Sequence, residues 1–175
     1  PLLWMIFNSF KNNEEIFSTN PFGIPTEFRF INYVKAWFEY DVVQYFSNSV
    51  LVTVATVFLT VCLAMMFAYA IARMDWKLSG AVKTYVSVGM FIPAQIILIP
   101  LVILVKDLHV NDTLLSVILP YVAFQTPFII TIFYGYLRQL PVEMEEAAAM
   151  DGASIYSIFL KIILPLVKPA IVSCA

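Results

Sequence analysis

The chain has 175 residues, of which 61% are hydrophobic and 13% charged, and its formal net charge is −2. Its mean hydropathy of +0.86 is too high for a soluble domain of this size, so the composition indicates a membrane protein. The small net charge says little about partners and gives no reason to expect a nucleic acid among them.

Stretches without charged residues predict the membrane spans. A hydrocarbon core of about 30 Å needs roughly 20 apolar residues in a helix. Three charge-free windows meet this requirement and predict spans at about 50–72, 84–105 and 114–137. Two shorter apolar stretches, 1–10 and 166–175, resemble the end of another span and the start of a further one.

These partial stretches, together with the lack of an initiator methionine, predict a fragment of a larger polytopic protein. We therefore expect one all-α transmembrane helical bundle over residues 1–175, truncated at both ends.

Lysine and arginine residues predict the orientation, because they are enriched in short cytoplasmic loops. Loop 73–83 carries three of them within a short stretch, 138–168 also carries three, and 106–112 carries one. Loop 11–41 has three as well, but it is long and holds five acids. We therefore place 73–83 and 138–165 in the cytoplasm, with 11–41 and 106–112 on the outer side.

The segment 141–165 differs from the spans because it carries acids, a glycine and a proline. Pro141 suits the first turn of a helix, and the glutamates that follow it are favoured there by the helix dipole. The alanines 147–149 favour helix and let another surface approach the backbone closely. Gly152 is expected to end this helix.

A second short helix is predicted after Gly152, and Pro165 is expected to stop it. Its apolar residues follow the helical repeat and form one stripe: Ile155, Ile158, Phe159, Ile162 and Ile163. Two helices of about ten residues are marginal alone, so they need a surface to pack against. The residues leave two alternatives open, an amphipathic hairpin on the lipid headgroups and a docking site for a cytoplasmic partner.

The identity and spacing of seven residues in this segment resemble the EAA loop of permease subunits in binding-protein-dependent ABC importers. The matching residues are Glu146, Ala147, Ala148, Gly152, Ile162, Leu164 and Pro165. The strings EEAAAMDGAS and LPLVKPA resemble the carbohydrate-uptake branch, the maltose- and glycerol-phosphate-type permeases. AYAIAR, IPLVILVKDLHVNDTLLSVILPYVAF and RQLPVEMEEAA look like the same family, so the resemblance runs from about Asn48 onward. It implies a MetI-like permease fold, here a fragment, with a cytoplasmic coupling-helix loop at 141–165.

In this family the loop sits in a groove of a separate ATPase subunit. By resemblance, Glu146 would make an ionic contact with the ATPase, Ala147 and Ala148 would allow close packing, and Gly152 would supply the bend. The full set of implied coupling residues is Glu145, Glu146, Ala147, Ala148, Asp151, Gly152, Ile162, Leu164 and Pro165.

The resemblance implies a permease subunit that moves a sugar or sugar derivative by alternating access in the plasma membrane of a prokaryote. Since the sequence has no GxxxxGK[ST] phosphate loop, we expect neither an enzyme nor a cofactor in this chain, with ATP and Mg bound by partner subunits. The implied partners are two ABC ATPase subunits, a second homologous permease and an extracytoplasmic solute-binding protein. The alternatives are a permease for an amino acid, peptide or phosphate, and a secondary carrier without an ATPase.

Polar residues inside the predicted spans are candidates for the substrate path, because polar groups are costly in lipid. Gln95 and Gln125 lie near prolines and could hydrogen-bond sugar hydroxyls, with Thr126 nearby, while Tyr121 could stack on a sugar ring. The alternative is that the glutamines join one helix to another and that Tyr121 only packs.

Two further groups of residues give weaker signals. His109 lies near Asp107 and Asp112, but a lone histidine with two loop carboxylates is typical of solvated surface, so no metal site is expected. Cys62 and Cys174 lie in apolar stretches, where cysteine acts as a small hydrophobe, and no disulfide is predicted.

Overall fold

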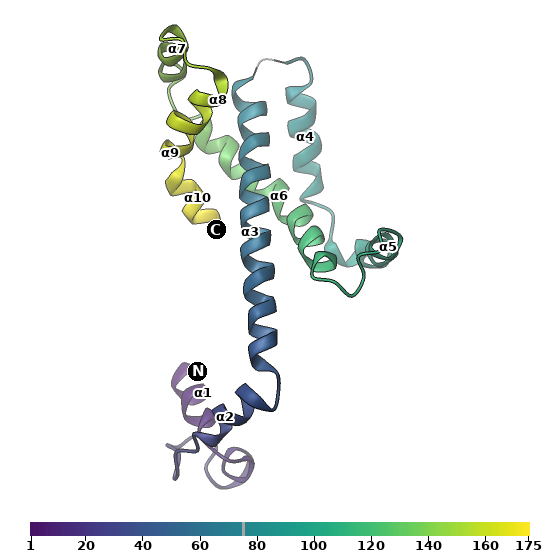
Figure 1. Ribbon diagram of the computed structural model, residues 1–175, viewed down its shortest axis with the longest axis vertical. Helices are drawn as coiled ribbons and strands as arrows, with labels where there is room; N and C mark the ends of the chain where they lie inside the picture. The colour runs from purple at the N-terminus through teal and green to yellow at the C-terminus, as the bar shows by residue number, and fades with distance from the viewer. Residues whose placement is uncertain (75) are drawn as a thin grey trace. The chain divides into compact units, whose positions relative to one another are not determined.

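The computed structural model describes residues 1–74 and 76–175, so Asp75 of the predicted loop 73–83 lies outside the described residues. The described residues form helices joined by turns and loops (Figure 1). In chain order the helices are α1 (Leu2–Ser9), η1 (Glu15–Thr19), α2 (Ile31–Phe38), α3 (Val42–Arg73), α4 (Ser79–Gly89), α5 (Ala94–Asp107), α6 (Leu115–Leu137), α7 (Glu143–Met150), α8 (Ile155–Ile158), η2 (Phe159–Ile163), α9 (Leu164–Leu166) and α10 (Lys168–Cys174). Here η denotes a π-helix. The predicted all-α fold is confirmed.

The chain divides into two compact units, Pro1–Val50 and Leu51–Ala175. In the first unit an aromatic cluster surrounds Phe10. Its ring centroid lies 5.5 Å from that of Phe28, 5.3 Å from that of Phe30 and 5.2 Å from that of Tyr33. Ring pairs at these separations add to the stabilisation from burial, so the segment before α2 packs against the end of α1.

A buried polar network completes the first unit. Lys11 is 2% exposed and Glu15 is 5% exposed. The Lys11 ammonium donates to the Asn20 carbonyl at 2.6 Å, and the Thr26 backbone N–H donates to the Glu15 carboxylate at 2.7 Å. These bonds satisfy charges that would otherwise be costly to bury, and they close the segment from Lys11 to Thr26 into a loop.

The Glu15 carboxylate is expected to make the first unit sensitive to acid. The hydrogen bond from the Thr26 backbone N–H lowers the pKa of Glu15. A lowered folded-state pKa stabilises the unit above the ordinary glutamate pKa, and this stabilisation is lost as the pH falls through the folded-state value. Amide exchange over 11–27, corrected for its intrinsic pH dependence, should therefore accelerate on acidification. The Glu15→Gln variant should lack this response, and an identical response in the variant would contradict the assignment.

Among residues 1–74 and 76–175, two single helices are long and apolar enough to cross a bilayer. They are α3, with 32 residues, and α6, with 23 residues. The predicted span 50–72 falls within α3, and the predicted span 114–137 matches α6 apart from its first residue. α3 contains neither glycine nor proline, whereas α6 contains Pro120 and Pro127, so α3 is the more regular of the two.

The predicted span 84–105 is divided into two helices, α4 and α5, which are bent by 99° relative to each other. The break falls at Pro93, which has an extended ψ of 129° and precedes α5. Proline has no N–H to donate and biases the residue before it away from helical conformation, which explains a sharp break here. Together the two helices have the length and composition of a span, but the bend is also compatible with a loop that enters and leaves the membrane on one side. Passage of this segment through the membrane therefore stays a prediction.

The prediction that Pro165 stops the second short helix is wrong. The helical path from Ile155 runs through Pro165 to Leu166 and bends by 67° only before Lys168. The π-helix η2 precedes the proline, and the Leu164 N–H bonds to the Phe159 carbonyl, five residues back. This wider turn accommodates the proline ring and its missing N–H without ending the helix.

The core of the second unit lies where α3, α6, η2 and α10 meet. Ala64 and Ala68 of α3 are fully buried, as are Phe133 and Leu137 of α6. Small residues four apart leave a shallow strip on α3, against which the larger side chains of the core pack. By contrast α5 has no buried residue, although its side chains are almost all apolar, which is expected of a surface that faces lipid.

Candidate functional site

The turn between α7 and α8 has the hydrogen-bond pattern of a glycine-terminated helix. The Ala153 N–H donates to the Ala148 carbonyl and the Gly152 N–H donates to the Ala149 carbonyl, both at 3.0 Å. Gly152 has φ +83°, which glycine adopts without strain. The next helix, α8, is capped by Ser154, whose hydroxyl accepts from the Ser157 N–H at 3.3 Å. We call α7, this turn, α8 and η2 the coupling pair.

The coupling pair presents an exposed face from its first helix and the turn. Glu146, Ala147, Asp151 and Gly152 are all exposed. Two apolar side chains beside them, Met150 at 89% exposed and Tyr156 at 77% exposed, were not among the predicted site residues. Exposed Met and aromatic side chains are enriched where proteins dock, so Met150 and Tyr156 favour a docking role for this segment.

The remaining predicted coupling residues are placed differently. Ala148 and Leu164 pack against the core of the second unit, and Ile162 is half-buried. Pro165 is exposed on the helical path that leads to α10. The close approach that Ala148 allows is therefore an approach to this chain's own core.

The Glu145 side chain contacts α3 of the same chain. Its carboxylate lies 2.9 Å from the Arg73 Nε, and the two side chains are 12% and 6% exposed. The Tyr69 hydroxyl donates to the other carboxylate oxygen at 2.8 Å. Arg73 additionally donates through Nη2 to the Leu137 carbonyl at 2.8 Å and to the Leu140 carbonyl at 2.7 Å. We call Tyr69, Arg73 and Glu145 the terminal clamp, because they join the end of α3 to α7 and to the end of α6.

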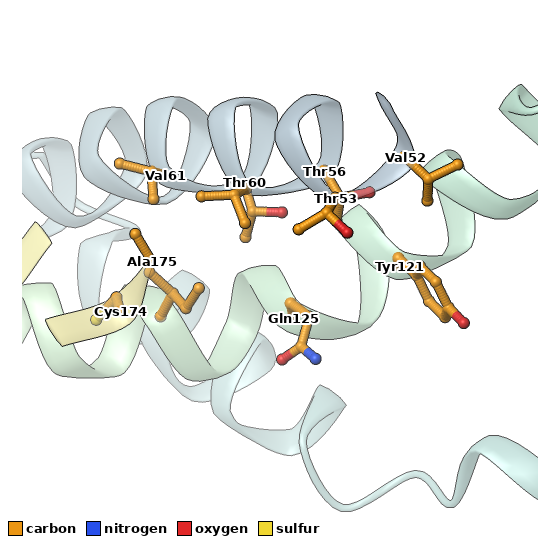
Figure 2. Close-up of a pocket in the computed structure, with 11 residues that line it drawn as sticks. Val52, Thr53, Thr56, Thr60, Val61, Tyr121, Gln125, Cys174 and Ala175 are labelled. Carbon is orange, nitrogen blue, oxygen red and sulfur yellow. The ribbon is translucent and has the colours of Figure 1, made fainter. Parts of the chain in front are cut away.

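A pocket of about 360 Å³ lies along α3 and α6 near the end of α10 (Figure 2). Thr53, Thr56 and Thr60 line it from α3, and Tyr121 and Gln125 line it from α6. The Thr56 and Thr60 hydroxyls are buried and have no hydrogen-bond partner among the described residues. Buried hydroxyls without partners are costly unless a ligand, water or another segment satisfies them.

The structure brings two of the four predicted substrate-path residues together. Tyr121 and Gln125 share the pocket, whereas Gln95 is exposed in the first turn of α5 and does not line it. The Thr126 hydroxyl donates to the Val122 carbonyl of its own helix, so its hydrogen-bonding capacity is used locally. Among residues 1–74 and 76–175, no group of three potential metal ligands is found. The backbone of His109 has a left-handed φ of 56°.

A model of the family described as "Binding-protein-dependent transport system inner membrane component" matches residues 60–175. The chain belongs to this family. The match begins within α3 and includes the terminal clamp, the coupling pair and all of α6. The resemblance drawn from the EAA-type spacing is thereby confirmed at the level of the family.

Relatives of this inner membrane component include permeases that are named for sugars. The chain is 34% identical over 175 residues to the diacetylchitobiose uptake system permease protein NgcG of Streptomyces coelicolor, covering 100% of this chain and 58% of that protein. It is 32% identical over 175 residues to "Probable starch degradation products transport system permease protein AmyC" of Thermoanaerobacterium thermosulfurigenes, covering 100% and 63%.

A solved structure shows the same fold. It is the crystal structure of a bacterial ABC transporter involved in the import of the acidic polysaccharide alginate, with a TM-score of 0.87 and 22% sequence identity. The match covers 100% of this chain and 62% of the solved one. The predicted permease fold is confirmed, and the chain spans less than two thirds of the length of these proteins.

Sequence reasoning on this permease-family chain missed Arg73, Tyr69 and Thr60. Arg73 was read only as an orientation signal at the end of a span, although a buried acid such as Glu145 needs a cationic partner. Tyr69 lies four residues before Arg73, so both face the same side of α3. The spacing of Thr53, Thr56 and Thr60 by three and four residues indicates a polar stripe within an apolar helix.

Proposed function

We propose that the complete protein is a permease subunit of an ATP-driven importer in the plasma membrane of a prokaryote. The observation that carries this proposal is the coupling pair, a helix turn that ends at Gly152 and exposes Glu146 and Ala147 within a chain of the binding-protein-dependent family. A folded helix pair that buries one face and exposes a small acidic and apolar patch supports docking by another protein rather than immersion among headgroups.

Coupling would follow from how the pair is held. An ATPase subunit that binds the exposed face would contact Glu146 as an acid and Ala147 at close range. Closure of two ATPase subunits would displace the pair, and the spans would change between inward-open and outward-open arrangements. The permease itself would bind no ATP and no Mg, since these belong to the ATPase partners.

The solute proposed is a sugar or sugar derivative. Support comes from the relatives, whose names refer to diacetylchitobiose and starch degradation products. It also comes from the pocket, where threonine hydroxyls, the Gln125 amide and the Tyr121 ring provide hydrogen-bonding groups beside an aromatic face. Small-molecule sites are mostly apolar and contain a few polar groups that fix the orientation of the ligand. A permease for an amino acid, peptide or phosphate is the second candidate, because a pocket with hydroxyls and an amide suits these solutes as well.

The proposed partners are two ABC ATPase subunits, a second homologous permease and an extracytoplasmic solute-binding protein. The family's description names a dependence on a binding protein. The proposed orientation puts 73–83 and 138–165 in the cytoplasm, and the contact between Arg73 and Glu145 supports placing these two segments on one side.

The experiment that tests this function is purification of the full-length tagged protein from its native membranes in mild detergent. Mass spectrometry would identify the proteins that accompany it, with the Gly152→Pro variant as control. We expect an ATP-binding subunit with the wild type and a reduced amount with the variant. A well-folded wild type that carries no ATPase would refute the proposal and favour a carrier that works without ATP.

The pocket assignment predicts that Thr60→Val weakens sugar uptake without destabilising the protein. Valine keeps the shape of threonine but removes a hydroxyl that has no partner among the described residues. We expect the apparent KM for uptake of the sugar bound by the co-purified binding protein to rise roughly 5- to 10-fold, as for one lost hydrogen bond. The melting temperature should be unchanged or higher.

Thr84→Val is the matched control for the pocket. The Thr84 hydroxyl donates to the Gly80 carbonyl of its own helix and lies outside the pocket. Its uptake kinetics should match the wild type. Equal KM values for Thr60→Val and the wild type would remove the pocket from the substrate path.

A further inference from the structure

The coupling pair contacts the spans through the core of the second unit and through a set of polar contacts at the end of α3. Tyr69 of α3 contacts both α7 and η2. The Tyr69 hydroxyl donates to Glu145 of α7 at 2.8 Å. The Tyr69 ring lies 5.0 Å from the ring of Phe159 in η2, at an interplanar angle of 59°. Tyr69 therefore bridges the two halves of the coupling pair from one turn of α3.

Arg73 extends this attachment to α6. Its Nε faces Glu145, while its Nη2 donates to the carbonyl of Leu137, the last residue of α6, and to that of Leu140 in the turn that follows. The last carbonyls of a helix have no partner within the helix and carry partial negative charge, so a guanidinium is well placed there. One planar group thus joins three helix ends, which a lysine ammonium reproduces poorly because it lacks the rigid fork of donors.

The ion pair between Arg73 and Glu145 is largely buried, so this attachment depends on both charges. Arg73 and Glu145 are 6% and 12% exposed, so removing one charge would leave the other in a poorly solvated position. The neighbouring acids differ, because Glu143 and Glu146 are exposed. Of the three glutamates in α7, Glu145 alone forms an ion pair among the described residues.

The element to which the pair is attached is suited to carrying a displacement. α3 is helical without interruption up to Arg73 and has no glycine or proline. Thr60 of the pocket lies nine residues before Tyr69, which is roughly 14 Å along a helix. A movement imposed on the end of α3 would therefore reach the pocket wall without a hinge between them.

We propose that the terminal clamp fastens the coupling pair to the ends of α3 and α6, so that a displacement of the pair changes access to the pocket. Tyr69, Arg73 and Glu145 are thus positioning residues that act inside the permease. This inference rests on the proposed function, because it names the internal path by which that function operates. In this proposal Glu145 makes its ionic contact within the permease, with Arg73, whereas the exposed Glu146 is available to contact the ATPase.

The first test measures the attachment itself in the full-length protein in lipid nanodiscs. Amide exchange in α7 should accelerate roughly 10- to 100-fold in Glu145→Gln and in Arg73→Lys, because a buried ion pair is broken. Tyr69→Phe keeps the ring contact with Phe159 and should show a smaller acceleration, which protects the test against a variant that fails to fold. Glu143→Gln, an exposed acid of the same helix, should match the wild type.

The second test measures transmission in the assembled transporter. A single cysteine replaces Thr53 in a background from which every native cysteine, including Cys62 and Cys174, has been removed. Its reaction with a membrane-impermeant maleimide is followed with and without ATP and vanadate. In the clamp-intact background and in Glu143→Gln, the nucleotide should change the labelling rate several-fold. In Glu145→Gln, the ATPase should still co-purify while the nucleotide response falls below about twofold, which corresponds to loss of coupling between sites.

The outcomes separate the inference from the proposed function. A wild-type labelling response in Glu145→Gln, with the ATPase bound, would overturn the clamp and leave the proposed function intact. Exchange in α7 that is unchanged in all clamp variants would overturn it as well. A clamp-intact protein that binds no ATPase would refute the proposed function, and the transmission role with it.

Discussion

Replacing Gly152 by proline is expected to abolish solute uptake while the protein still inserts into the membrane. Gly152 has φ +83°, and proline fixes φ near −65°. The variant also loses the N–H that donates to the Ala149 carbonyl at 3.0 Å. A proline at an incompatible backbone position costs about 3 kcal/mol or more, which is enough to disorder the turn between α7 and α8. Uptake by cells would be measured against the amount of protein in the membrane fraction.

Gly152→Asn is the matched control for this prediction. Asparagine tolerates positive φ better than other residues with a side chain, and it keeps the N–H. A Cβ at this position would meet no heavy atom within 4 Å, so space does not limit the substitution. We expect uptake near the wild-type rate in this variant. Normal uptake in Gly152→Pro would mean that the turn has no part in transport.

Leucine at Ala148 and leucine at Ala147 are expected to fail for different reasons. Ala148 packs against the core of the second unit, so a larger side chain there would push α7 away and destabilise the protein by about 1–3 kcal/mol. Ala147 is exposed, so the same change there should alter stability by less than about 0.5 kcal/mol. At Ala147 the added volume would instead obstruct the proposed ATPase contact.

Thermal unfolding of the purified permease and co-purification of the ATPase separate the two cases. Ala148→Leu should lower the melting temperature, whereas Ala147→Leu should keep it and reduce the amount of ATPase recovered. If Ala147→Leu destabilised the permease as much as Ala148→Leu does, the exposed face of α7 would be wrongly assigned. Full recovery of the ATPase with Ala147→Leu would place the docking surface elsewhere.

Local patterns were enough to predict much of this chain. Charge-free stretches predicted the apolar helices α3 and α6, because a bilayer excludes charged side chains whatever their neighbours in space. The end of α7 was also predictable, since a glycine after three alanines determines its own backbone geometry. The 99° bend between α4 and α5 was not predicted, although Pro93 favours a break there. Hydropathy measures how apolar a segment is and does not depend on the direction of the helix axis.

The sequence by itself determined that the chain is an all-helical membrane protein with a short helix that ends at Gly152, since propensity, hydropathy and turn chemistry depend on residues close in the chain. The tertiary structure decided which side chains face one another. Tyr69 and Glu145 are 76 residues apart, and only the packing of α3 against α6 brings them together. The same packing places Gln125 in the pocket and leaves Gln95 outside it. Contacts between distant segments depend on how whole helices pack, and no local pattern records that arrangement.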